Sequence, residues 1–453
     1  MRMPRHGFTR PFGIHELCYD VLQLVFEHLL SFPDDHWLVL GRGNFNPTRA
    51  RLPFALSAIC RHWRHLALRM PSLWTYLGVP CPTHSLVADW RPHLARVELV
   101  LARSGSAPLD VFLRWRRFEG MCDVQTWSAA EIVFARMVGA RARWRRAELH
   151  LRHHLPLSAF APLDGLAQEL VELCLDADKG CLPHAPKLAH LVVRNAACVW
   201  AFPGEENALP ELRALEVHGE RSEVLRKWLR KFGNRLEELA VAPRDDPWHL
   251  IQHALSTESS WLDLPNLVSL TQHFGMLLTP TNASNLTSLG LCAQYISDNI
   301  IDSCGLRHRD TVTRLHIFGP AGAEDVEILR VLPRVTRLAF TLTGEWAMRT
   351  KRRPGSGELV CGFLRAIAEG PNVWPELAEV AFVEWEESGG AHDLTTMAYH
   401  DEVVELLRAR NTPRSKSKGA SGDPTPARID KIQLNLRSAT PELIAVVDRL
   451  LVG

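Results

Sequence analysis

The stretch Pro210-Glu211-Leu212-Arg213-Ala214-Leu215 decides how most of the chain is expected to fold, because its pattern recurs. A proline is followed by an apolar residue two positions later and by a second apolar residue three positions after that. The pattern returns four times with the proline and twice without it, in segments that begin at Pro186, Pro265, Pro333 and Pro375, and at Leu236 and Leu286. After each segment comes a short alternating apolar run, which is typical of a strand entered from a turn.

The spacing of these segments indicates a repeat. Leu191, Leu215 and Leu239 end successive segments at intervals within the roughly 20–29 residues of a leucine-rich repeat. In such an array one strand per repeat stacks beside the next, and neighbours bury the face that a single repeat leaves open. We therefore predict an α/β fold, with a small N-terminal helical module and then an irregular leucine-rich-repeat solenoid of short parallel strands with helices or turns between them. A doubly wound α/β domain is the competing interpretation, but it does not need the same turn before every strand.

Two apolar segments near the N-terminus predict helices. The first, residues 17–29, has apolar side chains at helical spacing on one face, and further apolar residues widen that face. The second, residues 59–74 with the residues just before them, is expected to carry Leu56, Ile59, Trp63 and Leu66 on one helical face. Pro71 should end this helix, because the residue before a proline disfavours the α conformation. Two ordinary core helices would show the same periodicity.

The residue types in these segments resemble the F-box, the helical module that docks onto the small adaptor subunit of cullin-RING ubiquitin ligases. The family pattern opens with Leu-Pro-x-Glu and an apolar helix ending in Ile-Phe-x-x-Leu, and its second helix carries Val-Cys-Arg-x-Trp-Arg. The matching positions are Leu17, Asp20, Val25-Phe26 and Leu29, then Ile59-Cys60-Arg61-His62-Trp63-Arg64. Pro71-Ser72-Leu73-Trp74 resembles the Pro-x-Leu-Trp of fungal F-box proteins with leucine-rich tails. Cys18 departs from the pattern, because it stands where the family has proline.

The resemblance implies that the chain is the substrate-recognition subunit of an SCF-type ubiquitin ligase. Its F-box would dock the adaptor and through it a cullin, and its repeats would hold a substrate protein. The adaptor contact is expected among eight residues, some of which must instead pack inside the module. They are Leu17, Leu22, Val25, Phe26, Leu29, Cys60, Trp63 and Leu66.

Two other functions stay open. The chain could be a repeat scaffold outside any ligase, whose F-box-like helices merely cap the array. It could also bind nucleic acid through Arg141 to Arg146, although we expect Trp144 to pack inward while the arginines stay solvated. Lys and Arg number 52 against 51 for Asp and Glu, a net charge of +1, so no excess positive charge favours nucleic acid or an anionic membrane.

The pattern divides the chain into four parts. They are a tail over residues 1–11, the F-box module over 12–80 with an inserted loop over 31–53, a connecting region with the start of the array over 81–160, and the solenoid over 161–453. Residues 411–428 are rich in Ser, Pro, Gly, Lys and Arg, and we expect a disordered loop there. A last strand near Ile429 to Leu436 and a helix beginning at Pro441 should cap the array.

Catalytic and metal signals are weak, and we expect neither an enzyme nor a cofactor or metal site. His150 and His154 lack a partner at a useful spacing, and their segment is typical of a strand followed by a turn. Asp245-Asp246 with His249, and Cys304 with His308, lack the further groups that catalysis needs. The ten cysteines are scattered without a Cys-x-x-Cys pair, which favours a reducing compartment. With no secretory signal or membrane-spanning run, a cytoplasmic or nuclear location is expected.

Overall fold

The computed structural model describes residues 17–30, 45–79, 91–114, 124–151, 163, 165–177, 182–194, 209–218, 222–242, 263–272, 283–293, 296, 308–319, 321–343, 356–370, 372–385, 400–412, 426–434 and 441–452. The chain divides into two compact units, Met1–Leu212 and Arg213–Gly453, and each is described by itself. None of the described helices combines the length and the apolar content needed to cross a membrane.

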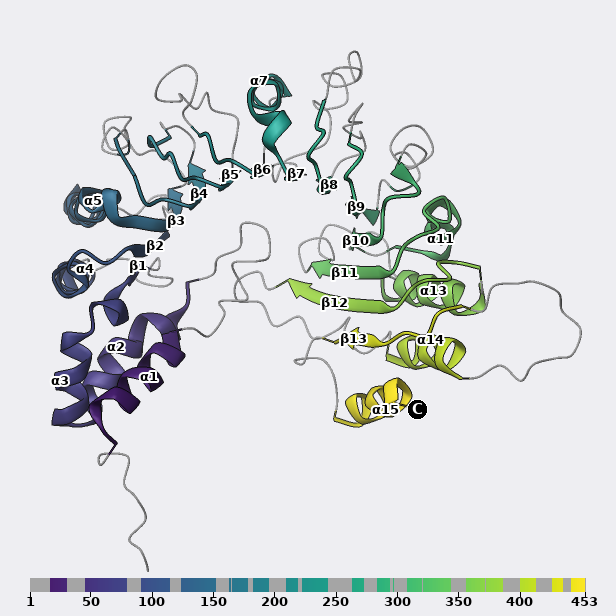
Figure 1. Ribbon diagram of the computed structural model, residues 1–453, viewed down its shortest axis with the longest axis horizontal. Coiled ribbons are helices and arrows are strands. Elements are labelled where there is room, and N and C mark those ends of the chain that lie inside the picture. The colour runs from purple at the N-terminus through teal and green to yellow at the C-terminus, as the bar shows by residue number, and fades with distance from the viewer. Residues whose placement is uncertain are drawn as a thin grey trace, which may run out of the picture. The chain divides into compact units, whose positions relative to one another are not determined.

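The first unit begins with a helical module. It consists of α1 (Tyr19–Leu30), α2 (Pro47–Ile59), α3 (Arg61–Arg69) and the short 3-10 helix η3 (Pro71–Trp74), which pack together in Figure 1. Asn46 caps α2, because its side-chain oxygen accepts a hydrogen bond of 2.9 Å from the Arg49 N–H. Cys60 has an extended backbone that separates α2 from α3, and its Sγ accepts from the Trp63 N–H at 3.4 Å.

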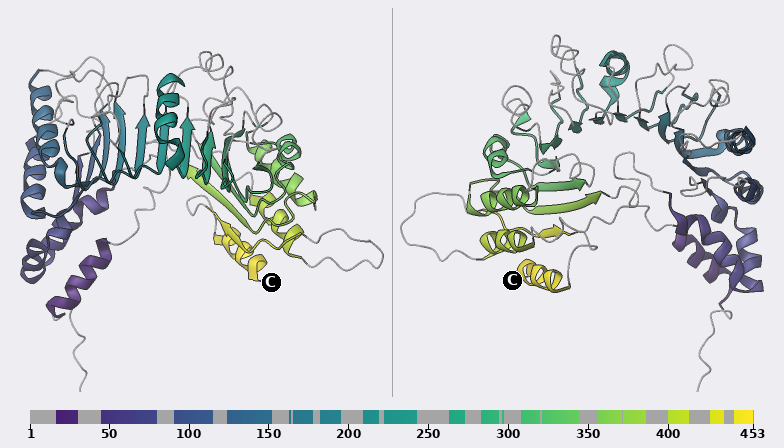
Figure 2. Two further views of the ribbon diagram at one scale, coloured as in Figure 1. Left: turned by 45° about the horizontal axis from the view of Figure 1, so that its top comes forward. Right: turned by 180° about the vertical axis from the view of Figure 1, so that it is seen from behind.

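The strands of the first unit follow the module. They are β1 (Tyr76–Val79), β2 (Leu109–Arg114), β3 (Trp144–Leu151), β4 (Glu172–Ala177) and β5 (His190–Arg194), each parallel to the next in chain order. Helices α4 (Arg91–Ser104) and α5 (Val124–Gly139) connect the first three strands, and the turn η4 (Arg141–Arg143) precedes β3. Figure 2 shows α4 and α5 beside each other on the same side of these strands. One buried apolar row crosses the sheet at a single register position, through Leu77, Val111, Ala147, Leu173 and Leu191.

The second unit repeats this arrangement. Its strands are β6 (Ala214–His218), β7 (Glu238–Ala242), β8 (Ser269–Gln272), β9 (Ser288–Cys292), β10 (Arg314–Phe318), β11 (Arg337–Thr343), β12 (Glu379–Trp385) and β13 (Lys431–Gln433). All are parallel and pair in chain order. The intervening helices are α7 (Ser222–Phe232), η6 (Gly233–Arg235), α11 (Ala323–Leu329), α13 (Ser356–Glu369) and α14 (His400–Asn411), and α15 (Pro441–Val452) ends the chain.

The predicted α/β fold of short parallel strands is confirmed. Each segment of the Pro-x-apolar-x-x-apolar pattern leads into a strand, and its last apolar residue lies at the same register position in every strand. In the second unit this row runs through Leu215, Leu239, Leu270, Leu289, Leu315, Leu338, Val380 and Ile432. All of its members except Ile432 are buried, so the repeated leucine is the residue through which neighbouring repeats share a core.

The N-terminal boundaries differ from the prediction. The helix expected to carry Leu56 and Ile59 on one face with Trp63 is in fact two helices, because the chain is extended at Cys60. Part of the predicted loop over 31–53 is helical, since α2 begins at Pro47, and residues 31–44 lie outside the described residues. The array also begins earlier, because β1 lies inside the predicted module over 12–80 and pairs with β2.

The C-terminal predictions fare better. The last strand is confirmed as β13 and the final helix as α15. Of the predicted loop over 411–428, residues 413–425 lie outside the described residues. Asn411 itself ends α14.

Candidate docking surface on the helical module

Helix α1 carries two apolar stripes rather than one. Leu22 and Phe26 have no exposed surface, and they form the stripe that faces the rest of the module. Val21, Leu24 and Val25 are 41%, 64% and 39% exposed and form the second stripe. We call these three residues the outer stripe of α1. They recur at i, i+3 and i+4, so their side chains lie together on one helical face.

The inner stripe is held by aromatic packing. The rings of Phe26 and Trp63 meet edge to face, with their centroids 5.1 Å apart. Leu66 on α3 is fully buried, and Trp74 donates a hydrogen bond of 2.8 Å from its Nε1 to the Ala67 carbonyl oxygen. These contacts complete a core between α1, α3 and η3, so the outer stripe is not needed to hold α1 in place.

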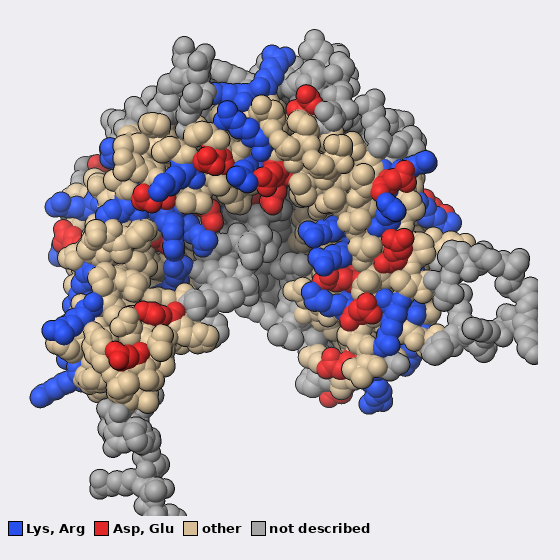
Figure 3. Space-filling model, viewed as in Figure 1, with Lys and Arg blue, Asp and Glu red and all other residues tan. Residues whose placement is uncertain are grey.

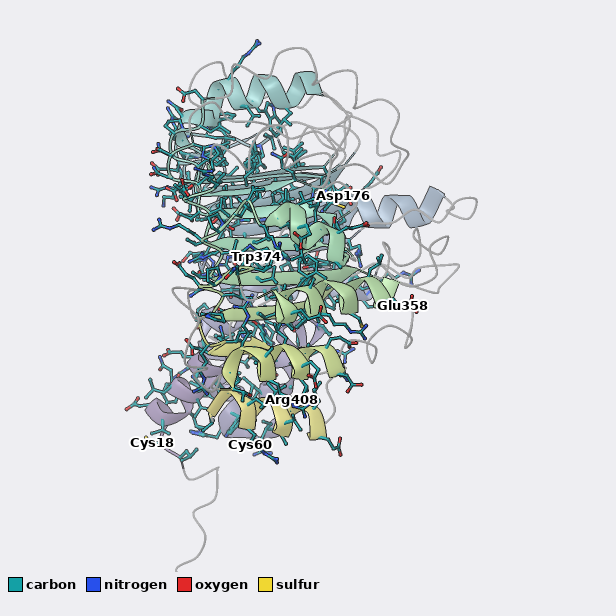
Figure 4. All side chains as sticks on the ribbon, turned by 90° about the vertical axis from the view of Figure 1, so that its right-hand side faces the viewer. Cys18, Cys60, Asp176, Glu358, Trp374 and Arg408 are labelled. Atoms are coloured by element: carbon teal, nitrogen blue, oxygen red, sulfur yellow. The ribbon has the colours of Figure 1, made fainter. Side chains whose placement is uncertain are left out.

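Two exposed acidic residues of α1, Asp20 and Glu27, lie four and three positions from Leu24 and therefore border the outer stripe. Single exposed apolar residues are normal on proteins, but three adjacent ones on one helical face are characteristic of an interaction site. Cys18, which precedes α1, is also exposed and lies at the edge of the module (Figure 4). Figure 3 shows both acidic and basic side chains on this end of the first unit. Two other exposed apolar residues of the module are Ile59, at the end of α2, and Leu68, on α3.

The eight predicted adaptor residues separate into two sets. Leu22, Phe26, Trp63 and Leu66 lie inside the module. Val25 is exposed, and Leu17, Leu29 and Cys60 are partly exposed. Cys60 has a local role as well, because its sulfur caps α3.

The sequence pattern placed Val21 and Leu24 only at the margin of the helical face. The structure makes them, with Val25, the most exposed apolar residues of α1. Periodicity could not show that these residues are exposed, because the residues of the two apolar stripes are interleaved along this short helix.

The module is fixed to the first strands of the array by charge. Asp110 on β2 has a fully buried side chain and lies 2.5 Å from the Arg49 guanidinium of α2. It also accepts two hydrogen bonds from Arg145, at 2.9 and 2.7 Å. Burial alone would raise the pKa of Asp110, but the hydrogen bonds and charges of Arg145 and Arg49 outweigh it and hold this pKa below its usual value.

A second contact joins α2 to α4. Arg96 donates a hydrogen bond of 2.6 Å to the Ala50 carbonyl oxygen, and its guanidinium lies over the ring of Phe54. The module and the first repeats therefore form one packed body within the first unit.

Three of the four arginines of the possible nucleic-acid site, Arg143, Arg145 and Arg146, have partners within the chain. Arg143 donates to Ser104 Oγ at 2.6 Å and to the Ala107 carbonyl at 2.9 Å. Arg145 is paired with Asp110, and Arg146 lies 3.1 Å from Glu172. Trp144 is buried as predicted. These arginines are used to join α4, β2, β3 and β4.

Of the histidine cluster, His150 lies in strand β3, as the sequence suggested. His150 is buried, with Nε2 against Glu148 and Nδ1 3.3 Å from Asp176 Oδ2. Among the residues that the structure describes, no group of three His, Cys, Asp or Glu side chains is arranged to hold a metal ion. His154, Asp245-Asp246 with His249, and Cys304 lie outside the described residues.

Comparisons with known proteins do not assign the chain to a family. No family model matches the chain, and no curated protein matches it in sequence.

Proposed function

We propose that the chain is a bridging protein of the F-box type, which docks a ubiquitin-ligase adaptor through its helical module and holds a substrate protein on its repeat array. The outer stripe of α1 is the single observation that carries the proposal. The resemblance of residues 17–29 and 59–74 to the F-box names the partner. The chain itself would make and break no bond, and its role would be to raise the effective concentration of substrate near the ubiquitin-loaded enzyme.

The energetics of α1 support docking at this face. Fully burying an exposed aliphatic side chain stabilises by about 1.5–3 kcal/mol. Val21, Leu24 and Val25 are already partly covered, with 41%, 64% and 39% of their surface exposed, so covering the rest contributes about 2–4 kcal/mol to an interface. The inner stripe already supplies the packing that holds α1. An adaptor would therefore bind a helix that is positioned before it arrives, which lowers the ordering cost of binding.

The test is capture of the adaptor by variants of the outer stripe. We expect Leu24→Glu with Val25→Glu to abolish co-purification of the adaptor while the array stays folded. Val452→Glu is the matched control, because Val452 is an 85% exposed valine at the end of α15. Phe26 is unsuitable for this test, since a charge there would disrupt the core of the module. Equal capture by both variants would contradict the proposed docking face.

A repeat scaffold outside any ligase is the second candidate. The contacts of Arg49 and Arg96 favour it. Arg49 fixes α2 to strand β2, and Arg96 fixes α2 to α4, as expected of a helix that caps the array. The two candidate functions predict different sets of proteins that co-purify with the chain from a cell extract. The ligase proposal expects adaptor and cullin to co-purify with the wild-type chain, whereas the scaffold expects neither.

A further inference from the structure

On strands β10 to β13, one face of the sheet is exposed at the start of the strands and buried further along, at Phe318 and Thr341. Phe340 on β11 meets Phe363 on α13 edge to face, with the ring centroids 5.2 Å apart. This contact places α13 on the face that carries Leu338 and Phe340. Side chains alternate along a strand, so Arg337 and Ala339 belong to the opposite face.

A row of charged residues crosses the exposed part of this face. The register pairs Arg314 with Arg337, Arg337 with Glu379, and Glu379 with Lys431, each on the next strand from β10 to β13. Arg314, Arg337 and Lys431 are exposed. Figure 3 shows basic side chains gathered on the second unit, with acidic ones between them.

The row has more positive than negative charge. Arg337 Nε lies 3.1 Å from one oxygen of Glu379, and Lys431 Nζ lies 2.6 Å from the other. One carboxylate is therefore shared by two cations. Arg314 adds a third cation, and its neighbour on β9 is Ser288, which brings no compensating charge.

The placement of Arg314 opposite Arg337 is unfavourable for the isolated chain. Like charges directly across neighbouring strands destabilise a sheet. An anion bound between the two guanidinium groups would relieve that repulsion, and a carboxylate matches the fork of guanidinium donors.

The next row on the same face has short side chains. Ala339 and Ala381 are partly exposed, and they lie beside the charged row on β11 and β12. His316 on β10 occupies the equivalent position, with its ring stacked on Phe318 and its Nε2 2.6 Å from Thr341 Oγ1. Burial lowers the pKa of His316 to about 4, so the ring is uncharged near neutral pH. Room for a partner chain is therefore left at Ala339 and Ala381, which add no charge, and not at the buried ring of His316.

We infer that Arg314, Arg337 and Lys431, with Ala339 and Ala381 beside them, form a binding strip for an acidic extended segment of a partner protein. Carboxylates of the segment pair with Arg314 and Arg337, and its backbone lies over the two alanines. Arg314 and Lys431 are three strand spacings apart, or about 14 Å, which roughly four to five residues of extended chain can span. The inference deepens the proposed function, because it names the class of segment that the array would hold.

The test uses the full chain and no adaptor, so its failure is distinct from a failure of docking. The probe is a fluorescein-labelled ten-residue peptide of alternating glutamate and glycine, followed by fluorescence anisotropy. We expect the peptide to bind and added salt to weaken the binding, since exposed charges are screened. The same peptide with glutamine in place of glutamate should bind at least about tenfold more weakly.

Variants identify the strip. Arg314→Glu should weaken peptide binding about tenfold, and Arg314→Gln should weaken it less. Arg408→Glu on α14 is the matched control, because Arg408 is an exposed arginine of the same unit that lies on a helix and pairs with Glu405. The affinity of the Arg408→Glu variant for the peptide should stay within about twofold of the wild-type affinity. Val25→Glu should also bind the peptide normally.

Several results would overturn the inference. They are no binding of the glutamate peptide, equal binding of the glutamine peptide, or equal weakening by the Arg314 and Arg408 variants. Tighter binding of a labelled single-stranded RNA that displaces the peptide would assign the strip to nucleic acid instead. Circular dichroism and the thermal midpoint confirm that each variant is folded.

Discussion

The first and last described helices of the chain, α1 and α15, have the same length, but we propose different roles for them. Each has 12 residues and an apolar sequence. α15 buries Leu443 and Val447, and Asn411 on α14 donates a hydrogen bond of 3.0 Å to the Leu450 carbonyl near its end. α1 buries Leu22 and Phe26 but leaves its outer stripe exposed.

The number of apolar stripes would distinguish a capping helix from a docking helix. A cap needs one apolar stripe, because its work ends once the last strand is covered. A docking helix needs a second stripe for a partner, and that stripe contributes nothing to the stability of the isolated chain. Substitutions can therefore separate the two kinds of apolar residue by their effect on stability and on binding.

The largest effect is expected within α1 itself. Phe26→Ala should lower the free energy of unfolding by about 3–5 kcal/mol, because it removes a buried ring from its packing against Trp63. Leu24→Ala, only two residues away, should change it by no more than about 0.5 kcal/mol. Urea unfolding of both variants checks the comparison. Similar losses for the two would mean that the outer stripe is part of the core.

The next effect concerns the attachment of the module to the array. Asp110→Asn should cost about 2–3 kcal/mol at neutral pH, because it breaks the ion pairs of a buried carboxylate with Arg49 and with the partly exposed Arg145. Glu169→Gln is the control, since the pair of Glu169 with Lys187 is exposed and its loss should cost under about 1 kcal/mol.

The cost of Asp110→Asn should also depend on pH. The pKa of Asp110 is lowered in the folded chain, so its ion pairs stabilise above the unfolded pKa of about 3.9. That stabilisation is lost as the pH falls through the lowered folded-state value. The difference in unfolding free energy between wild type and variant should therefore shrink below pH 4, and a difference that stays constant would contradict the pairing.

A smaller effect sharpens the comparison between the two end helices. Val447→Ala on α15 removes two buried methyl groups and should cost about 1–2 kcal/mol. Val25→Ala on α1 makes the same chemical change at an exposed position and should cost no more than about 0.5 kcal/mol. Thermal unfolding of the matched pair measures the difference. Equal destabilisation would show that Val25 contributes to the core of the chain as Val447 does, and would contradict a docking role for the outer stripe.

The smallest effect concerns Cys60. Cys60→Ala removes a weak sulfur acceptor from the start of α3 and should cost about 0.5 kcal/mol, at the low end for a helix cap. Cys60→Ser supplies a stronger acceptor and should retain or raise stability. A large loss with serine would indicate that Cys60 contributes by packing rather than by capping.

The repeats were predictable because each depends on local sequence. A turn, with a proline in five of the seven segments, leads into a buried aliphatic residue and a short strand, and parallel pairing follows from stacking similar segments. Leu215 and Leu338 could be recognised as equivalent without any knowledge of the distant parts of the fold.

The helical module was less predictable for two physical reasons. Pro53 suggested the end of a loop but lies inside α2, where tertiary contacts outweigh its poor helical propensity. Cys60 does not mark a helix break by residue type, so the sequence predicts one helix from the end of α2 through α3. Which of the two α1 stripes is buried depends on Trp63 and Trp74, whose placement periodicity does not give.

The most direct test of the central claim is hydrogen exchange of the chain with and without the purified adaptor. The account predicts that peptides covering α1 become protected when the adaptor is added, whereas peptides covering α15 exchange as before. Unchanged exchange of α1 in the presence of a saturating adaptor concentration would contradict it.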